Sequence, residues 1–425
     1  MSRRAELGVG TDAEGMTARH RPRGALRHAL GLMTPSMMAA AKMTLERDAG
    51  LRARRLGAAA LDRVREQRRP TRPRMRALTI APAGRIEWRE VPAPPPPGPD
   101  AAVVHPIAIA TCDLDRAMAL GVAPFPLPLH FGHECVAEVL SIGDRVTNVR
   151  PGQRVVVPFQ ISCGSCRPCD AGHTSNCASV PPVSMYGFGV GGGHWGGAVS
   201  DQLLVPFADA MLVALPEGID PAAAASVADN VSDGYRHVGP YVEDLLARDP
   251  DAEVLIISSI KRRPVLGPSV LLYAGLVARA LGVRSVHFAD SRASVRQHAE
   301  ELGLTSLRPH QLRRQALAPL VVDGSGTPAG LKVALERTAP DGICSSAASF
   351  HRVNRIPGVL LYGRNVTYRL ARAHTRILIP KVLDLMVTRQ LQPEKVTTRL
   401  ERLDDAPRAL KCHVFGDVTK TVLVE

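Results

Sequence analysis

The sequence predicts an α/β protein in which a β-rich domain is joined to a doubly wound parallel sheet. Short β-rich runs separated by Pro and Gly fill the chain from residue 75 to about residue 216. After Pro221, strands and helices alternate, as they do where helices cover both faces of a parallel sheet. The 425 residues, of which 45% are hydrophobic and 22% charged, suffice for two or three domains with real cores.

Composition excludes several classes of protein. No run approaches 18 consecutive apolar residues, so no membrane span is expected, and the apolar content excludes disorder along the whole length. The net charge of +13 is unevenly placed, because residues 1–74 hold 17 Lys and Arg against 7 Asp and Glu. The remaining chain is nearly neutral, so we expect no nucleic-acid partner.

Residues 1–74 are predicted to be a basic, disordered extension of the folded body. Arg-rich and Ala/Leu/Met stretches alternate there, which leaves open an amphipathic targeting or membrane-surface segment. The start of the chain lacks the apolar core of a signal peptide. We therefore expect a cytoplasmic protein whose thiols stay reduced.

The elements follow from these patterns in chain order. In the first part, the expected strands are residues 76–80, 85–91, 101–110, 135–142, 153–159 and 202–205. In the second part, helices are expected at 222–247, 269–281, 293–302 and 329–337, and strands at 254–258, 285–289, 320–322 and 342–346. A helix at 376–390 and a strand at 419–424 return to the first domain. The predicted domains are 75–232, with a lobe at 160–180, then 233–365, and a return segment at 366–425.

The strongest chemical signal is the run Cys163-x2-Cys166-x2-Cys169-x7-Cys177. Two-residue spacers let successive thiolates face inward on one tight loop, and a fourth thiolate closes a tetrahedron around Zn²⁺. Four protein ligands leave no position for a substrate, so this pattern predicts a structural zinc. An iron–sulfur cluster or four unrelated thiols are the alternatives.

A second set of residues is more dispersed. Cys112 follows an expected strand, and Gly132-His133-Glu134 stands at the start of another. Either motif alone is weak, because a single Cys usually packs in a core and a single His usually finds a hydrogen-bond partner. Their position upstream of the four-cysteine run and of the α/β part makes the combination informative.

From residue 75 to the end, the chain resembles the zinc-dependent medium-chain alcohol dehydrogenase family. The match lies in the Gly-His-Glu motif, the four-cysteine lobe and the βαβ part that follows, and in Asp229-x4-Gly234-Tyr235. The resemblance implies a GroES-like β-rich catalytic domain and a Rossmann domain. It also implies that each chain holds two Zn²⁺ ions, and that the chains form homodimers or homotetramers.

The resemblance assigns roles to individual residues. It implies a catalytic zinc held by Cys112, His133 and Asp229, with the fourth position open to substrate. Glu134 is the adjacent glutamate that stands beside the metal or exchanges onto it. Asp115 matches a carboxylate that orients the ligand histidine. One thiolate, one carboxylate and a neutral imidazole balance the charge of Zn²⁺; an aspartate used as a helix cap is the alternative for Asp229.

The chain departs from the family pattern at the proton relay. The hydroxyl residue expected two positions after the ligand cysteine is Leu114, and the histidine expected five positions after it is Ala117. A proton must leave during alcohol oxidation, so water or another group carries it.

The loop after the expected strand 254–258, where the family binds the nucleotide, also departs from the family pattern. A Rossmann turn uses G-x-G-x-x-G to bring backbone amides to a pyrophosphate. Here only Gly267 survives, and Leu271 replaces the glycine that packs the helix. The basic residues Lys261, Arg262 and Arg263 either supply charge to phosphates or form a solvated loop beside a degenerate site.

We take Gly267, Ser269, Asp290, Arg292 and Gly324 as candidate cofactor-binding residues. Asp290 ends an expected strand where an acidic residue bonds the adenosine ribose, which favours NAD. Ser291 and Arg292 follow directly and keep NADP possible.

The sequence therefore predicts a zinc-dependent, NAD(P)-dependent alcohol dehydrogenase that transfers a hydride between an alcohol and its aldehyde or ketone. The alternative is a non-catalytic zinc protein of the same fold, with an eroded nucleotide site, that serves as a binding or scaffold module.

Overall fold

The structure is a computed structural model that describes residues 72–425 except 82–84, 121–122, 124, 126, 262–263, 265 and 348–354. Nearly all of the predicted extension, residues 1–71, lies outside the described residues, as do Arg262 and Arg263. Within the described part of the chain, no helix has the length and apolar character that a membrane crossing requires.

The β-rich half consists of short helices and of strands that pair antiparallel, except for the parallel pair β15 and β16. Its strands are β1 (Arg74–Ala81), β2 (Arg85–Pro92), β3 (Ala102–Ala110), β4 (Leu129–His130), β5 (Glu134–Ile142), β6 (Arg154–Val157), β7 (Leu203–Val205), β8 (Val213–Ala214), β15 (Arg399–Arg402) and β16 (Thr421–Val424). Its helices are α4 (Asp115–Ala119), α5 (Arg167–Asp170), η2 (Thr174–Asn176), η3 (Gly189–Gly192), α6 (Ala208–Met211), η7 (Leu403–Asp405) and α14 (Ala406–Phe415).

Two sheets organise this half. Among the described residues, one sheet has the order β15-β16-β3-β5-β6-β8 with β7 also paired to β3, and a smaller sheet has the order β2-β1-β4. Leu78, Ile80, Ile109 and Phe131 are almost fully buried between these elements. Burial of such side chains is the main favourable contribution to the stability of this half.

The second half is a parallel sheet covered by helices. Its strands are β9 (Glu253–Ile257), β10 (Ser285–Ala289), β11 (Thr305–Leu307), β12 (Ala318–Asp323), β13 (Thr338–Ser346) and β14 (Thr367–Leu370). The helices and turns are α7 (Pro221–Ala224), η4 (Ala225–Ala228), α8 (Asn230–Arg248), α9 (Ser269–Ala280), α10 (Ala293–Glu301), η5 (Pro309–Arg313), α11 (Pro328–Arg337), α12 (Gly358–Arg364), α13 (Thr375–Val387) and η6 (Pro393–Val396).

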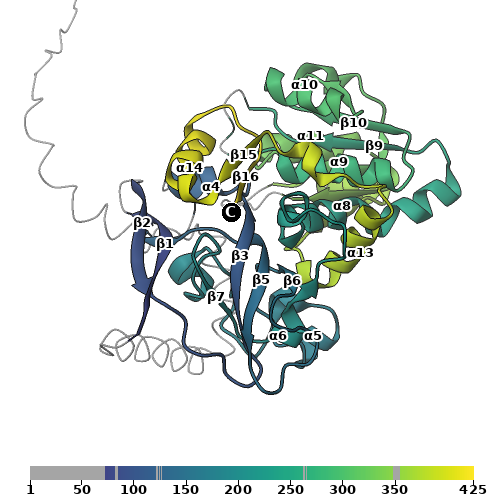
Figure 1. The fold of residues 1–425 in the computed structure, drawn as a ribbon. Coiled ribbons are helices and arrows are strands. Elements are labelled where there is room, and N and C mark those ends of the chain that lie inside the picture. Colours follow the sequence, from purple (N-terminus) through teal and green to yellow (C-terminus); the bar gives the residue numbers. More distant parts are fainter. Residues whose placement is uncertain are drawn as a thin grey trace, which may run out of the picture.

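The strand order in the described residues is β11-β10-β9-β12-β13-β14, and every neighbouring pair is parallel. This is the doubly wound order, with its switch point between β9 and β12, and it confirms the predicted fold class. Figure 1 shows β9 and β10 with their helices on one side of the molecule and β1, β2 and β3 on the other. The crevice for a ligand is expected at the carboxyl ends of β9 and β12.

The parallel sheet extends further along the chain than the sequence suggested. β14 follows residue 365, where we expected the chain to leave this sheet, and it pairs with β13. Helix α13 packs beside α8, with Ile379 and Val382 in the same buried cluster as Val238. Only β16, together with β15, returns to the β-rich sheet. β14 is difficult to foresee because it has four residues, three of them exposed.

The register of three strands brings distant segments to one end of the β-rich sheet. Ala110, at the end of β3, is opposite Glu134, at the start of β5, and opposite Val422 of β16. The residues just beyond these positions must therefore lie close together, although the segments are far apart in sequence.

Candidate metal centres and nucleotide edge

The first candidate site lies at one end of the β-rich sheet, where β3 finishes and where β5 and β16 begin. Cys112 follows β3 by two residues, and His133 immediately precedes β5, whose first residue is Glu134. Asp229 stands between η4 and α8, and η4 packs against β5. Register and helix packing therefore place side chains from three separate segments in one location.

The structure brings the predicted catalytic set together. One ligand atom from each of Cys112, His133, Glu134 and Asp229 lies within 4.8 Å of the others, and all four residues are buried. Asp229 Oδ2 is 3.7 Å from Cys112 Sγ and 3.4 Å from His133 Nε2. These separations suit atoms that share one ion, because each bond to zinc is about 2.0–2.3 Å long.

Gly132 explains how His133 reaches this position. Its φ is +96°, and an added Cβ would come within 2.7 Å of the Val199 side chain and 2.8 Å of its backbone nitrogen. Glycine is therefore required directly before the histidine. The imidazole then packs between two phenylalanines, with ring centroids 4.8 Å from Phe188 and 5.6 Å from Phe159.

The electrostatics of this cluster favour a bound cation. Burial, followed by the carboxylates of Asp229 and Asp115, raises the pKa of the Cys112 thiol well above its usual value. His133 Nε2 is buried, and within the described residues it has no hydrogen-bond partner. A buried nitrogen without a partner is costly unless it binds something. A thiol, an imidazole and a carboxylate around one point fit Zn²⁺ well.

Asp115 is buried beside the cluster but makes a different contact from the one expected. Its Oδ2 accepts a hydrogen bond from the Cys112 backbone amide at 2.6 Å, while its Oδ1 is buried without a hydrogen-bond partner among the described residues. Burial raises the pKa of this carboxyl to about 6, although the nearby His133 opposes the shift. In this structure, Asp115 fixes the backbone of the cysteine.

Two further residues complete the cluster, and sequence reasoning missed both. Lys420, fully buried, donates from Nζ to Glu134 Oε2 at 2.8 Å and Oε1 at 3.1 Å, and to Asn230 Oδ1 at 2.9 Å. Asn230 Nδ2 donates to Asp229 Oδ2 at 3.0 Å and lies 3.4 Å from Cys112 Sγ. Burial by itself lowers the pKa of Lys420, but Glu134 together with Tyr273, Cys112 and Asp113 more than offsets this and raises it. The pair holds Glu134 beside the metal position.

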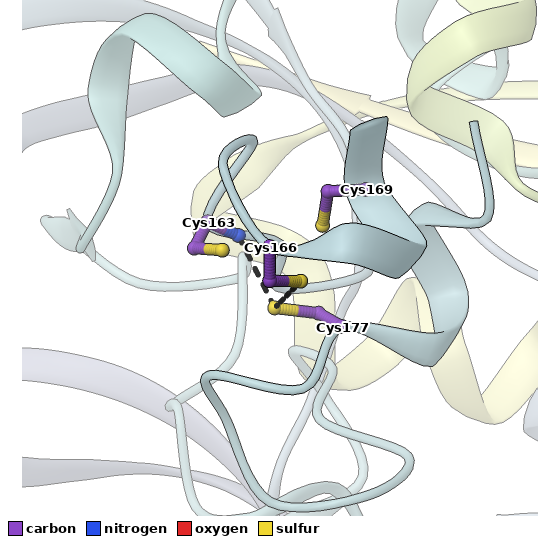
Figure 2. Close-up of side chains that lie close together, drawn as sticks. All are labelled: Cys163, Cys166, Cys169 and Cys177. Atoms are coloured by element: carbon purple, nitrogen blue, oxygen red, sulfur yellow. Dashed lines mark hydrogen bonds between the residues drawn. The ribbon is translucent and has the colours of Figure 1, made fainter. Parts of the chain in front are cut away.

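The four-cysteine lobe forms the second candidate centre. The thiols of Cys163, Cys166, Cys169 and Cys177 lie within 4.8 Å of one another, and Figure 2 shows them converging from α5 and its flanking loops. The Cys163 amide donates to Cys177 Sγ at 3.3 Å, and the Ala178 amide donates to Cys166 Sγ at 3.3 Å. Backbone donors aimed at sulfur stabilise thiolates, which are the form that binds zinc.

One of these thiols is already poised for ionisation. Burial raises the pKa of Cys163, but hydrogen bonds from Ser179 and Ser165 more than offset it, and the pKa falls to about 6. The lobe therefore fits a closed four-sulfur site without a position for substrate.

The nucleotide edge at the start of α9 is occupied by the protein itself. Asp113 Oδ1 accepts from the Ser269 amide and Oδ2 from the Val270 amide, both at 2.9 Å. The Ser269 hydroxyl also donates to Oδ1, and the Gly267 amide donates to the Asp113 carbonyl at 3.0 Å. The predicted residues Gly267 and Ser269 thus lie at the helix start, but their amides already have an acceptor.

The other predicted cofactor residues also have internal partners. Arg292 bonds both oxygens of Asp290, with Nη2 2.7 Å from Oδ2 and Nε 3.0 Å from Oδ1. Gly324 lies at the end of β12, where an added Cβ would be 2.4 Å from the Leu271 side chain. As they stand, these residues do not fit a bound dinucleotide, because the amides and the carboxylate that would recognise it are already engaged.

A cavity of about 300 Å³ adjoins this edge. Its lining includes Asp113, Arg116, Gly267, Arg292 and His413. Arg116 and Arg292 bring positive charge to its wall, but Asp113 and Asp417 also line it and Arg292 is paired with Asp290.

Comparison with known proteins shows to which family this chain belongs. Residues 98–217 match the Alcohol dehydrogenase GroES-like domain family. The medium chain reductase/dehydrogenase ucsI of Acremonium sp. is 31% identical over 236 residues, which cover 52% of this chain and 74% of that protein. The chain belongs to the zinc-dependent medium-chain dehydrogenase family.

Other relatives are similar to this chain over a larger share of its length. A Mycobacterium tuberculosis protein named as a zinc-binding alcohol dehydrogenase, Rv1895, is 28% identical over 344 residues, covering 79% of this chain and 84% of that protein. The solved structure of alcohol dehydrogenase TADH from Thermus sp. ATN1 superposes with a TM-score of 0.71 at 28% identity, covering 82% of this chain and 99% of that one. The GroES-like match contains Cys112, His133 and the four-cysteine lobe, whereas Asp229 and the nucleotide edge lie beyond it.

The two centres predict the metal content of this medium-chain dehydrogenase. We expect close to two zinc ions per chain by mass spectrometry of the purified, full-length protein. Cys163→Ser removes one ion and His133→Ala removes the other, because each variant deletes one ligand from one centre. Cys412→Ser, which alters a thiol outside both clusters, leaves both ions in place. Retention of both ions by His133→Ala would contradict the first centre.

The Lys420–Glu134 pair predicts a stability effect. Lys420→Met leaves the Glu134 carboxylate buried and unpaired, so we expect the free energy of unfolding to fall by about 3–5 kcal/mol. The double variant Glu134→Gln/Lys420→Met removes both charges and loses less. Urea unfolding measures both, with the exposed Lys411→Met as control. Equal losses in Lys420→Met and Lys411→Met would show that the pair contributes no stability.

Proposed function

We propose that this chain is a zinc-dependent oxidoreductase that interconverts an alcohol and its aldehyde or ketone. The observation that carries the proposal is the convergence of Cys112, His133 and Asp229 in a buried cluster in which the imidazole nitrogen has no other partner among the described residues. Relatives named as an alcohol dehydrogenase or a geraniol dehydrogenase support it, and none of the comparisons favours the scaffold alternative.

Cys112, His133 and Asp229 would hold the catalytic zinc. Their thiolate and carboxylate charges balance the dication, while Lys420 neutralises Glu134 and holds it out of the ligand set. Zinc bound there supplies Lewis-acid chemistry that stabilises the alkoxide form of a substrate alcohol. Asn230 bonds Asp229 and contacts the Cys112 sulfur, so it orients two of the three ligands.

Apolar side chains surround His133. Phe159 and Phe188 pack on the imidazole and are themselves buried in the core of the β-rich half, so they exclude water from the ring. Leu114 packs against the core of the β-rich half, and Ala117 is buried within it. Neither side chain carries a proton, so the proton leaves by a route that avoids both positions.

The hydride acceptor in this proposal is a nicotinamide dinucleotide, with NAD favoured over NADP. Asp290 at the end of β10 supports NAD, since a carboxylate there accepts from ribose hydroxyls and repels a 2′-phosphate. The Asp290–Arg292 pair must open before that contact forms.

The proposal also covers the second metal centre and the division of the chain into domains. We propose a structural zinc in the four-cysteine lobe, a GroES-like catalytic domain over residues 75–232, and a Rossmann domain from residue 233. The pairing of β14 extends that domain to Leu370. A homodimer or homotetramer and a cytoplasmic location stay predictions.

The test is a panel of alcohols, aldehydes and ketones assayed with NAD(H) and NADP(H). We expect turnover of at least one alcohol/carbonyl pair, and a fall in kcat/KM of at least about a thousandfold in Cys112→Ser and His133→Ala. Cys412→Ser serves as the control and keeps wild-type rates. Equal rates in wild type and His133→Ala would refute the proposed metal chemistry.

A further inference from the structure

We propose that Asp113 is an internal competitor for the diphosphate of the dinucleotide, so that the cofactor binds only by displacing the Asp113 carboxylate from the start of α9. This inference rests on the proposed function, because it concerns how the proposed cofactor enters its site. It identifies Asp113 as a residue that limits cofactor affinity.

The geometry of Asp113 is that of an anion bound at a helix N-terminus. Its two carboxylate oxygens accept separately from the amides of Ser269 and Val270, each at 2.9 Å. α9 runs for 12 residues from Ser269, so these amides are the free donors of its first turn. The partial positive charge of a helix start favours a bound carboxylate.

The same amides are the ones that a dinucleotide needs. β9 leads into α9 at the switch point of the doubly wound sheet, where the pyrophosphate of a dinucleotide lies on the helix N-terminus. A carboxylate and a phosphate cannot use these donors together. Their like charges also repel each other at this distance.

The backbone that leads directly into α9 has no free donor between Gly267 and Val270. Residue 268, which directly precedes the helix, is proline and has no N–H group. The amide of Gly267, the next residue back, donates to the Asp113 carbonyl at 3.0 Å. Every backbone donor from Gly267 to Val270 is therefore either missing or engaged by Asp113.

The Asp113 carboxylate packs closely against the backbone of Gly267. A Cβ on this residue would lie 2.3 Å from Asp113 Oδ1 and 3.0 Å from Asp113 Cα. The one glycine kept in this loop thus makes room for the aspartate.

The contact also joins the nucleotide edge to the metal cluster. Asp113 directly follows Cys112, and the Ser269 hydroxyl lies within hydrogen-bond distance of both Asp113 Oδ1 and Asn230 Oδ1, the latter at 2.9 Å. One hydroxyl hydrogen serves one acceptor at a time. Displacement of Asp113 therefore leaves Ser269 free to donate to Asn230, which contacts Cys112 and Asp229.

The arginines of the adjoining cavity provide a place for the displaced or incoming charge. Arg116 and Arg292 line the same cavity of about 300 Å³ as Asp113 and Gly267. A diphosphate that replaces the carboxylate would meet two guanidinium groups as well as the helix start. The proposal thus predicts weak binding by the wild type rather than none.

The test is a titration of the full chain with NADH and NADPH, followed by fluorescence, with ADP as a probe that lacks nicotinamide. Asp113→Asn removes the charge while keeping the size of the side chain, and we expect it to bind NADH about tenfold more tightly than wild type. Asp113→Ser is a second variant, which removes the charge and also shortens the side chain. Zinc content and circular dichroism check that both variants fold.

The control variant is Asp417→Asn, which removes a carboxylate from the same cavity but, in the described residues, has no hydrogen bond to α9. We expect a much smaller change in affinity than with Asp113→Asn. Unchanged NADH affinity in both Asp113 variants would overturn the inference and leave the proposed function intact. An equal gain in Asp417→Asn would also overturn it. Absence of NADH and NADPH binding by every variant at millimolar concentration would overturn both.

Discussion

The candidate metal site depends on one electrostatic requirement. Acidic groups are buried together around the imidazole of His133, and their negative charge must be balanced. Cys112, Glu134 and Asp229 converge on His133, and the buried cation Lys420 is bonded to Glu134. Carboxylates and thiolates are costly to bury unless a positive charge balances them. The dication proposed between Cys112, His133 and Asp229 would meet that requirement.

Strand register is the means by which the fold creates this cluster. β3 lies between β5 and β16, so the residues beyond Ala110, before Glu134 and before Val422 meet at one end of the sheet. Asp229 arrives from the other half of the molecule, at the junction of η4 and α8. The same junction supplies Asn230, whose amide nitrogen reaches two ligands and whose carbonyl oxygen accepts from Lys420 and lies 2.9 Å from the Ser269 hydroxyl. Metal site and nucleotide edge are therefore physically continuous.

Features carried by local pattern could be predicted from the sequence. The two-residue spacing of Cys163, Cys166 and Cys169 predicted the four-cysteine lobe. The alternation of strands and helices along the sequence predicted the doubly wound sheet. β14 was hidden because it is short and exposed. Lys420 was hidden because its role requires the pairing of β16 with β3, although a lysine opening an apolar strand was a usable signal. Asp113 was hidden because its partners are backbone amides more than 150 residues away.

Anomalous diffraction at the zinc edge, from crystals of the full-length chain, tests the central claim most directly. The account predicts one peak enclosed by the sulfur of Cys112, the Nε2 of His133 and the carboxylate of Asp229, and a second peak among the four sulfurs of the lobe. A peak in the lobe alone, with ordered but metal-free side chains around His133, would contradict it.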